Sequence, residues 1–569
     1  MRERLSLKDN ARLDEARSWH LNGEFLAAQS TYESLMKKYP GNGVVQGLLG
    51  ALFVDSGAPK QAIPVLQRAT RHNKKDANAH YNLGLAFAEI DKHAEAIGAY
   101  KRAIAADPKH TKAYYNLGFS YRRCDRLAEA VKAFERDFAI APASDTCRLL
   151  TRTFMELEKF DRALFYANRC VELEGARPED LNLLIVLICR QMALAPAIST
   201  QEAEELIALA DHATTLTPNS VPALVNQGRA YSQLGRFEAA LPPLQAALQL
   251  EPEHDTAHSL YGIALLTEGK LFEGWHERTV LERMRKMVTP TGVSRWQGQL
   301  QSGYKLWVTR EQGVGDQILY ARMLQDLVAA GVDVTLVCEK RIHPLFERSF
   351  PEVTLSTGLD EDAQKLQDGF ATLGELHLTL RKDLAAIPAP ENYLLPDADL
   401  KEKFRARYAN AYPGKTITGI AWRSHSEVNG AGKSVPLDEL LPVLQSPDRV
   451  FVCVQYGEGW DELQAHAEKH GYLVHYDEDA DSLASLEDGA AQLAALDELV
   501  SVSNASVHMA GAMGVACHVL VGQRPVWHWF SENTAPDALS PWYTNVRLYR
   551  QQSLSDWHAP IAQIAEQLT

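Results

Sequence analysis

The stretch KLWVTREQGVGDQILY, residues 305–320, predicts a buried strand, a glycine-rich turn and the start of a helix. Leu306–Val308 is a short apolar run of residues that favour strands. Gly313 and Gly315 free the turn from the restriction that a Cβ imposes, and Asp316 opens an amphipathic segment. In α/β proteins such turns bind phosphates and anionic substrates, because unpaired N–H groups and the helix dipole point outward there.

Composition limits the class of protein. The 569 residues exceed what one core supports, so about two to four domains are expected. A net charge of -15 argues against nucleic acid as a partner and against docking to an anionic membrane. The seven cysteines are scattered without metal-ligand spacing, which favours reduced thiols. The first residues form no apolar signal segment and no stretch is long enough to span a membrane, so we expect a cytoplasmic protein.

The first half of the chain repeats itself. Leu83 and Gly84 recur 34 residues later as Leu117 and Gly118, and Pro108 recurs as Pro142. This period is typical of tetratricopeptide repeats, which the sequence resembles closely. The expected repeats are 9–42, 43–76, 77–110 and 111–144. The pattern loosens from 145 to 220, returns with Gly228 and Pro252, and is expected to end near Val288.

Stacked repeats would form a superhelix with a concave groove. Asn82, Asn116 and Asn226 occupy one equivalent repeat position. Their amides could bind the backbone of an extended peptide, since an amide side chain both donates and accepts. This resembles the asparagine ladder of eukaryotic O-GlcNAc transferase. The alternative is that these are polar residues tolerated on a solvated helix face.

The second half alternates strands and helices, which predicts two α/β lobes. The expected strands are 304–309, 333–338, Val353–Ser356, Thr416–Trp422, Val450–Gln455, Tyr472–Tyr476, Leu499–Ser503 and His518–Val521, with a closing helix at Trp557–Leu568. The predicted fold class is an N-terminal all-α tetratricopeptide superhelix followed by a GT-B-like α/β body of two Rossmann-like lobes. The expected domains are 1–288 for the repeats, 289–410 for the acceptor-side lobe and 411–569 for the nucleotide-sugar lobe.

Several spaced fragments carry a resemblance to one family. They are EQGVGDQILYARML, ENYLLP, GIAWRS, KSVPL, LVSVSNASVHMAGAMGV and SPWYTNVRLYRQ. Their order resembles bacterial tetratricopeptide proteins with a glycosyltransferase domain similar to the ADP-heptose lipopolysaccharide heptosyltransferases. The resemblance implies a metal-independent, nucleotide-sugar-dependent glycosyltransferase. It also implies a protein acceptor held by the repeats, with flagellin and a nonulosonic acid, carried on a nucleotide such as CMP, as the first candidates.

The resemblance also implies roles for individual residues. Asp316 matches the aspartate proposed to activate the acceptor hydroxyl, although capping of the helix is an alternative role. Gln312, Gly313 and Gly315 would form the acceptor-side turn. Positive and N–H-rich groups must stabilise the departing phosphate. The residues expected to bind the donor are Arg423, Lys433, Ser503, Asn504, Ser506, His508 and Gly511.

Other interpretations stay open. Asn504 and Ala505 stand where the family usually has Asp-Thr, so a non-catalytic scaffold is one alternative. A heptosyltransferase-like enzyme acting on a lipid-linked saccharide is another. Gly313 and Gly315 after a strand also imitate part of a dinucleotide fingerprint, but Ile318 fills the third glycine position. No metal site or cofactor is expected, and the acidic stretch from Asp477 is interpreted as solvated loop charge.

Overall fold

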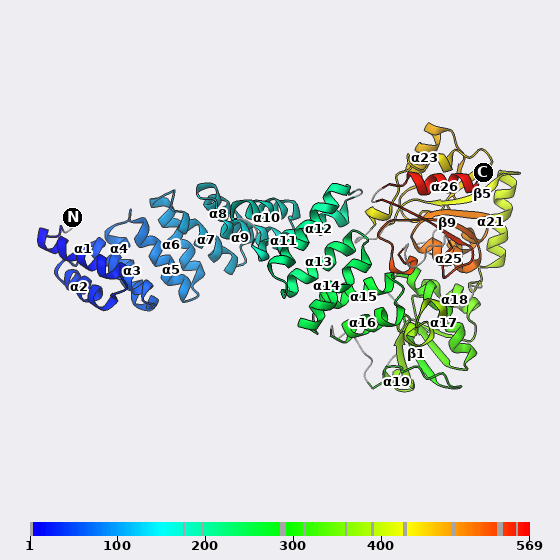
Figure 1. Ribbon diagram of the computed structural model, residues 1–569, viewed down its shortest axis with the longest axis horizontal. Helices are drawn as coiled ribbons and strands as arrows, with labels where there is room; N and C mark the ends of the chain where they lie inside the picture. The colour runs from blue at the N-terminus through cyan, green and yellow to red at the C-terminus, as the bar shows by residue number, and fades with distance from the viewer. Residues whose placement is uncertain are drawn as a thin grey trace. The chain divides into compact units, whose positions relative to one another are not determined.

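The computed structural model describes residues 4–174, 177–195, 198–284, 292–310, 313–358, 361–387, 392–424, 430–480, 485–531, 539–553 and 556–568 (Figure 1). The chain forms two compact units, Met1–Leu187 and Ile188–Thr569. The boundaries expected from the sequence, near residues 288 and 410, are different divisions and stay predictions. Every helix in the described part is too short or too polar to cross a bilayer.

The first unit consists of antiparallel helix pairs (Figure 1). Its helices are α1 Leu7–Leu21, α2 Phe25–Lys38, α3 Gly43–Asp55, α4 Pro59–His72, α5 Ala77–Glu89, α6 His93–Ala106, α7 Thr111–Arg123, α8 Leu127–Ile140, α9 Ser144–Glu156, α10 Phe160–Glu174 and most of α11 Pro178–Leu194. The four repeats expected between residues 9 and 144 coincide with the pairs α1–α2 to α7–α8. The predicted tetratricopeptide array is therefore confirmed.

A glycine on the first helix of a repeat lets a large side chain of the second helix pack against its backbone. A Cβ on Gly84 would lie 2.4 Å from Tyr100 Cε1, and one on Gly118 would lie 2.5 Å from Phe134 Cε1. Tyr100 and Phe134 are fully buried. The recurring Leu-Gly pair therefore marks the closest approach of the two helices, where only glycine leaves room.

Each repeat turns between its helices at a residue with positive φ. The angle is +73° at Gly57, +61° at Asp91 and +57° at Asp125, at intervals of 34 residues. Glycine adopts this conformation without steric cost, and aspartate tolerates it better than most residues. Glu158, 33 residues after Asp125, also has a positive φ, of +57°. The backbone repeat thus persists into the region where the sequence pattern loosens.

The second unit begins with repeat helices that are continuous with an α/β core. These helices are α12 Thr200–Leu216, α13 Val221–Gln233, α14 Phe237–Leu250, α15 Asp255–Thr267 and α16 Leu271–Met284. Trp275 of α16 is 2% exposed and stacks on His377, with ring centroids 4.9 Å apart. It also meets Tyr320 and Trp527 edge to face. The last repeat helix is therefore part of the hydrophobic core that contains the strands.

A four-stranded parallel sheet follows, in the order β3-β2-β1-β4. Its strands are β1 Lys305–Thr309, β2 Asp333–Val337, β3 Thr354–Ser356 and β4 Gly369–Thr372. Its helical segments are α17 Val314–Ala329, η1 Lys340–Ile342, α18 His343–Ser349, α19 Glu361–Lys365, η2 Gly374–Leu376, α20 His377–Leu380 and η3 Leu384–Ala386. The three predicted strands are present, and β4 was not predicted.

The second sheet is parallel and six-stranded, in the order β10-β9-β8-β5-β6-β7. Its strands are β5 Thr416–Ala421, β6 Arg449–Cys453, β7 Val474–His475, β8 Glu498–Val502, β9 Ala516–Val521 and β10 Val546–Arg550. Its helical segments are α21 Ala398–Ala411, η4 Ala431–Lys433, α22 Leu441–Leu444, α23 Trp460–His470, α24 Leu486–Ala494, α25 Ala505–Met513, η5 Trp527–Trp529 and α26 His558–Leu568. The five strands predicted here are present, and β10 was not predicted.

The interpretation of the stretch from Asp477 as solvated charge is wrong for Asp477 itself. Its side chain is fully buried and accepts hydrogen bonds from Tyr408 (2.5 Å) and Gln492 (2.9 Å), with His475 at 3.1 Å and an ion pair to Arg407. Burial raises the pKa of Asp477, but these partners outweigh burial and hold the pKa at about 2. Asp477 therefore links α21, α24 and the end of β7.

Asp477→Asn is expected to lower the free energy of unfolding by about 3 kcal/mol, because Arg407 loses its buried counter-charge and Tyr408 loses a carboxylate acceptor. Since the folded pKa lies below the ordinary value of 3.8, the carboxylate's stabilisation is present above about pH 4 and is lost as pH falls through about 2. Urea unfolding at neutral and acidic pH measures both effects. Asp479→Asn is the control, since Asp479 also binds Arg407 but is 44% exposed and should cost under about 1 kcal/mol. Equal losses in the two variants would contradict the role of Asp477.

Candidate functional site

Each sheet has one point where the strand order reverses. In the first sheet this point lies between β1 and β4, and in the second it lies between β5 and β8. Ligands of open parallel sheets bind outside the carboxyl ends of the strands at such points. Helix α17 begins just after β1, and α25 begins just after β8. The two strand-to-helix turns therefore lie where open parallel sheets bind ligands.

The two turns meet through Gly315. A Cβ there would lie 3.0 Å from His508 Cδ2 and 3.5 Å from Ala505 Cα, so the first turns of α17 and α25 pack closely. Gly313 caps α17 with a φ of -91°, an ordinary value for any residue. Glycine is thus required at position 315 because a larger side chain would collide with α25. Gln312, which was also predicted to belong to this turn, lies outside the described residues.

Asp316 lies in the first turn of α17, and its carboxylate folds back toward the start of the helix. A Cβ on Gly313 would be 3.0 Å from Asp316 Oδ2. Because Gly313 occupies the N-cap position, the alternative interpretation of Asp316 as the N-cap is wrong. A carboxylate is favourable in this turn because of the helix dipole.

Two half-buried cations lie on loops of the second sheet, and one of them, Lys433, is within electrostatic reach of Asp316. Burial lowers the pKa of Lys433, and the charge of Asp316 opposes that change. Burial also lowers the pKa of Arg524, whose Nη2 would lie 2.9 Å from a Cβ on Gly432. In the described part of the chain, neither cation has a carboxylate within 4.0 Å. Such desolvated cations suit an anionic ligand.

Arg524 was missed by sequence reasoning, although a signal existed. It follows the predicted strand His518–Val521 by three residues, and loops after parallel strands are the usual ligand contacts. Arg423, which was predicted to meet phosphate, is exposed and pairs with Glu462 at 2.6 Å. Reaching a phosphate would require Arg423 to give up that ion pair.

The start of α25 offers polar groups at the end of β8. Asn504 caps the helix by accepting from Val507 N (3.3 Å), while its buried Nδ2 has no hydrogen-bond partner among the described residues. Ser503 Oγ accepts from Trp529 Nε1 at 2.8 Å. Ser506 lines a cavity of about 230 Å³ with Val314, Ala505 and other residues of both lobes. Ser506 therefore faces this cavity, whereas the amide nitrogen of Asn504 is buried from solvent.

His508 and Gly511 face the protein interior. His508 is 3% exposed, its Nδ1 lies 3.1 Å from Tyr543 Oη, and its Nε2 lies 3.2 Å from His528 Nε2. Burial, with a smaller effect from the charge of Lys433, lowers the pKa of His508 to about 3. A Cβ on Gly511 would meet Val546 and Tyr543. A phosphate contact by the neutral His508 stays a prediction, and it would require this network to open.

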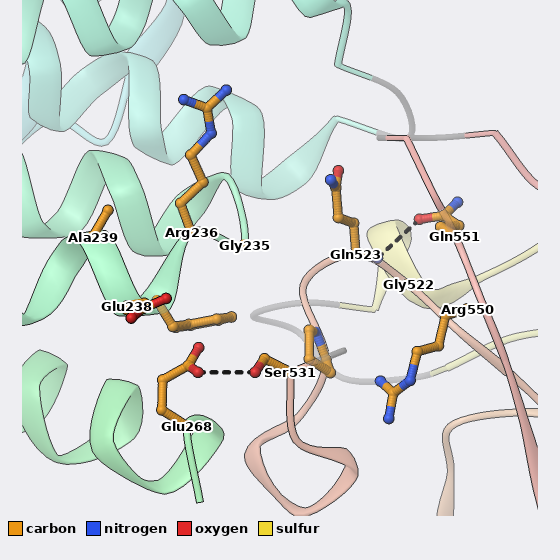
Figure 2. Close-up of a pocket in the computed structure, with 12 residues that line it drawn as sticks. Gly235, Arg236, Glu238, Ala239, Glu268, Gly522, Gln523, Ser531, Arg550 and Gln551 are labelled. Carbon is orange, nitrogen blue, oxygen red and sulfur yellow. Dashed lines mark hydrogen bonds between the residues drawn. The ribbon is translucent and has the colours of Figure 1, made fainter. Parts of the chain in front are cut away.

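A second cavity, of about 370 Å³, lies between the last repeat turns and the carboxyl edge of the six-stranded sheet (Figure 2). Glu268, after α15, accepts from Ser531 Oγ at 2.9 Å across it. A Cβ on Gly235 would lie 2.4 Å from Gln523 O, so the α13–α14 turn presses on the loop after β9. Gln523 and Pro525 line the cavity and flank Arg524. The cavity therefore adjoins the cationic site.

The asparagines predicted to line a peptide groove lie on the first helices of their repeats. Asn82 is half-buried on α5, and Asn226 is buried on α13 in the other unit. Asn116 Nδ2 donates to Tyr81 Oη (3.1 Å) and to Lys112 O (3.0 Å). The amide donor of Asn116 is thus used within the repeats, which leaves its oxygen for a peptide.

Basic side chains line a different cavity of the first unit. This cavity, of about 680 Å³, is lined in part by Arg71, Lys74, Lys75 and Arg102 of the segment from α4 to α6. Asn82 does not line it. The asparagines and this basic cavity are therefore distinct features of the array.

These features define a tetratricopeptide-repeat protein with a C-terminal region of parallel α/β sheets. Sequence profiles described as tetratricopeptide repeat match residues 48–111 and 225–273, and another matches residues 99–132. The chain is 31% identical over 423 residues to Protein FlbA of Caulobacter vibrioides, covering 69% of this chain and 68% of that protein. The chain belongs to the family of Protein FlbA.

Solved tetratricopeptide structures resemble part of the chain. YrrB, described as a TPR protein with an unusual peptide-binding site, is 24% identical, and the match covers 34% of this chain and 95% of YrrB with a TM-score of 0.30. A crystal structure of MamA is 26% identical over 30% of this chain and 95% of MamA, with a TM-score of 0.27.

Proposed function

We propose that this protein is a glycosyltransferase that moves a sugar from a nucleotide-sugar to a Ser or Thr hydroxyl of a protein acceptor. The proposed α/β body is GT-B-like, with the donor on the six-stranded sheet and the acceptor at the start of α17. The supporting observation is the close packing of the α17 and α25 turns at Gly315. The Asp316 carboxylate of α17 also lies within electrostatic reach of Lys433.

The proposed reaction uses groups on both sides of this contact. Asp316 accepts the proton of the acceptor hydroxyl, while the oxygen of that hydroxyl bonds to the anomeric carbon of the sugar. The bond from that carbon to the nucleotide phosphate breaks, and the phosphate leaves with the electron pair. Lys433 and Arg524 would stabilise the charge that grows on the phosphate, and their half-buried positions strengthen this effect. We propose that the transfer needs no catalytic metal and no cofactor besides the nucleotide-sugar.

The proposed acceptor is held by the repeats. It reaches the turns at the starts of α17 and α25 from the C-terminal end of the repeats. The cavity in Figure 2 supports this path, since it joins the last repeat turns to the loop that carries Arg524. Asn82, Asn116 and Asn226 are the proposed contacts for the acceptor backbone. Flagellin is the first protein to test, with a nonulosonic acid on a CMP-linked donor. The reaction would take place in the cytoplasm.

Intact-mass analysis tests the proposal directly. Flagellin is co-expressed with the full chain in cells that make the nucleotide-sugar, and in matched cells without the chain. We expect a mass increase of one or more sugar residues only when the chain is present. Unchanged flagellin mass, with the donor shown to be present in the cells, would overturn flagellin as the acceptor. Unchanged masses across the soluble proteome as well would overturn transfer to a protein acceptor.

A non-catalytic scaffold is the second candidate function. The buried His508, with both ring nitrogens engaged, and the Asn504 and Ala505 departures favour it. A scaffold would bind the acceptor and co-purify with it while leaving its mass unchanged. The same co-expression experiment therefore separates the two functions.

A further inference from the structure

We infer a binding site for a divalent transition-metal ion of the Zn²⁺ class, formed by Asp438, His466 and His470. His466 and His470 lie one helical turn apart on α23, so both side chains project from the same face. Asp438 comes from the turn before α22. One ligand atom from each residue lies within 4.8 Å of the other two. Two histidines and a carboxylate are ligands that this class of ion prefers.

The distances suit one ion between the three residues. Asp438 Oδ1 lies 3.0 Å from His466 Nε2 and 3.8 Å from His470 Nε2. Ligands placed about 2.0–2.2 Å from a tetrahedral Zn²⁺ are themselves about 3.3 Å apart. Small side-chain rotations would therefore complete the geometry. Asp438 is 73% exposed, so an ion could reach the site and a water molecule could fill a fourth position.

The hydrogen bonds around the histidines support metal ligation. His466 Nδ1 lies 2.8 Å from Tyr472 Oη. His466 Nε2 is hydrogen-bonded to Asp438 Oδ1 at 3.0 Å. A bound ion would take the place of that proton, and Nδ1 would then donate to Tyr472 Oη, which is how outer partners orient metal-binding histidines. His470 Nε2 is buried and has no hydrogen-bond partner in the part of the chain that the structure describes. Among the described residues, the three ligand atoms therefore share one hydrogen bond, and a bound ion would replace it.

The ion would steady the segment that carries Lys433. Asp438 follows Lys433 by five residues, and the intervening segment is already anchored because Val435 N donates to Trp422 O (2.9 Å). Coordination would add a link from this segment to α23. Lys469, which precedes His470 on α23, places a positive charge near Asp438 and weakens the attraction for a cation. We therefore expect the affinity of the site to be moderate.

Zn²⁺ and Co²⁺ binding to the full-length, EDTA-treated protein tests the inference. Equilibrium dialysis with metal analysis should find one Zn²⁺ per chain that the variants below lose. Co²⁺ bound at the same site should produce visible ligand-field absorption. His470→Gln and Asp438→Asn should each weaken Zn²⁺ binding at least about 10-fold. Hydrogen exchange should slow in residues 434–440 of the wild type when Zn²⁺ is added, and should not slow in the variants.

His276→Gln is the matched control, because His276 is exposed on α16 and lies outside the cluster. It should bind Zn²⁺ like the wild type. Asp438→Asn changes an exposed side chain, so it keeps the test valid if His470→Gln fails to fold. Equal Zn²⁺ affinity and stoichiometry in the wild type and Asp438→Asn would overturn the site. None of these measurements depends on sugar transfer.

Discussion

Asp316→Asn is expected to reduce sugar transfer about 10²- to 10⁴-fold while leaving the fold and acceptor binding intact. Asparagine keeps the size and most hydrogen-bonding capacity of the side chain but cannot accept the hydroxyl proton. The N-cap residue of α17 is Gly313, which the substitution leaves unchanged. Transfer rates with saturating donor and acceptor measure the effect.

Asp333→Asn is the control for this variant. Asp333 begins β2 at the opposite end of the same sheet and is exposed. Its variant should transfer sugar at the wild-type rate. Wild-type transfer by Asp316→Asn, with matched thermal stability, would show that Asp316 is not the base.

Lys433→Met is expected to lower kcat/KM for the donor about 10²- to 10³-fold, because methionine fills the same space without the charge that stabilises the leaving phosphate. Burial lowers the Lys433 pKa in the folded protein, so the substitution removes a desolvated charge. The loss of activity should therefore accompany unchanged or slightly higher thermal stability. Donor titration and a thermal melt measure the two effects.

Lys415→Met provides a matched removal of charge. Lys415 precedes β5 at the amino end of the sheet, and its Nζ donates to Pro447 O at the surface. Its variant should keep wild-type donor kinetics. If both lysine variants lost the same activity, the effect of Lys433 would reflect the net charge of the protein and not a site.

The parts of the fold predicted from sequence are those fixed by local pattern. Leu83-Gly84 and its copy 34 residues later mark a helix contact that each repeat makes for itself. The strands β4 and β10 were missed because β4 is four residues long and begins with glycine, and β10 alternates exposed Arg547 with buried residues. These strands form because β4 pairs with the edge of β1 and β10 pairs with the edge of β9.

The candidate site was also predictable only where a local sequence pattern marks its residues. Asp316 and Lys433 follow strands that the sequence marks clearly, and the structure brings their charges within reach of each other. The buried surroundings of His508 come from Tyr543 and His528, which lie 35 and 20 residues further along the chain. Asp477 likewise owes its burial partly to Tyr408, 69 residues earlier. A single sequence carries no local pattern for such distant partners.

The burial of Trp275 has a consequence for the evolution and engineering of the array. Repeat arrays usually end in a cap whose outer face is polar, which lets the array be moved between proteins. Here α16 buries Trp275 against Tyr320, His377 and Trp527, so the α/β region itself serves as the cap. A fragment cut near residue 288 would expose this aromatic face and tend to aggregate. The last repeats and the α/β region must therefore be inherited, and transplanted, as one piece.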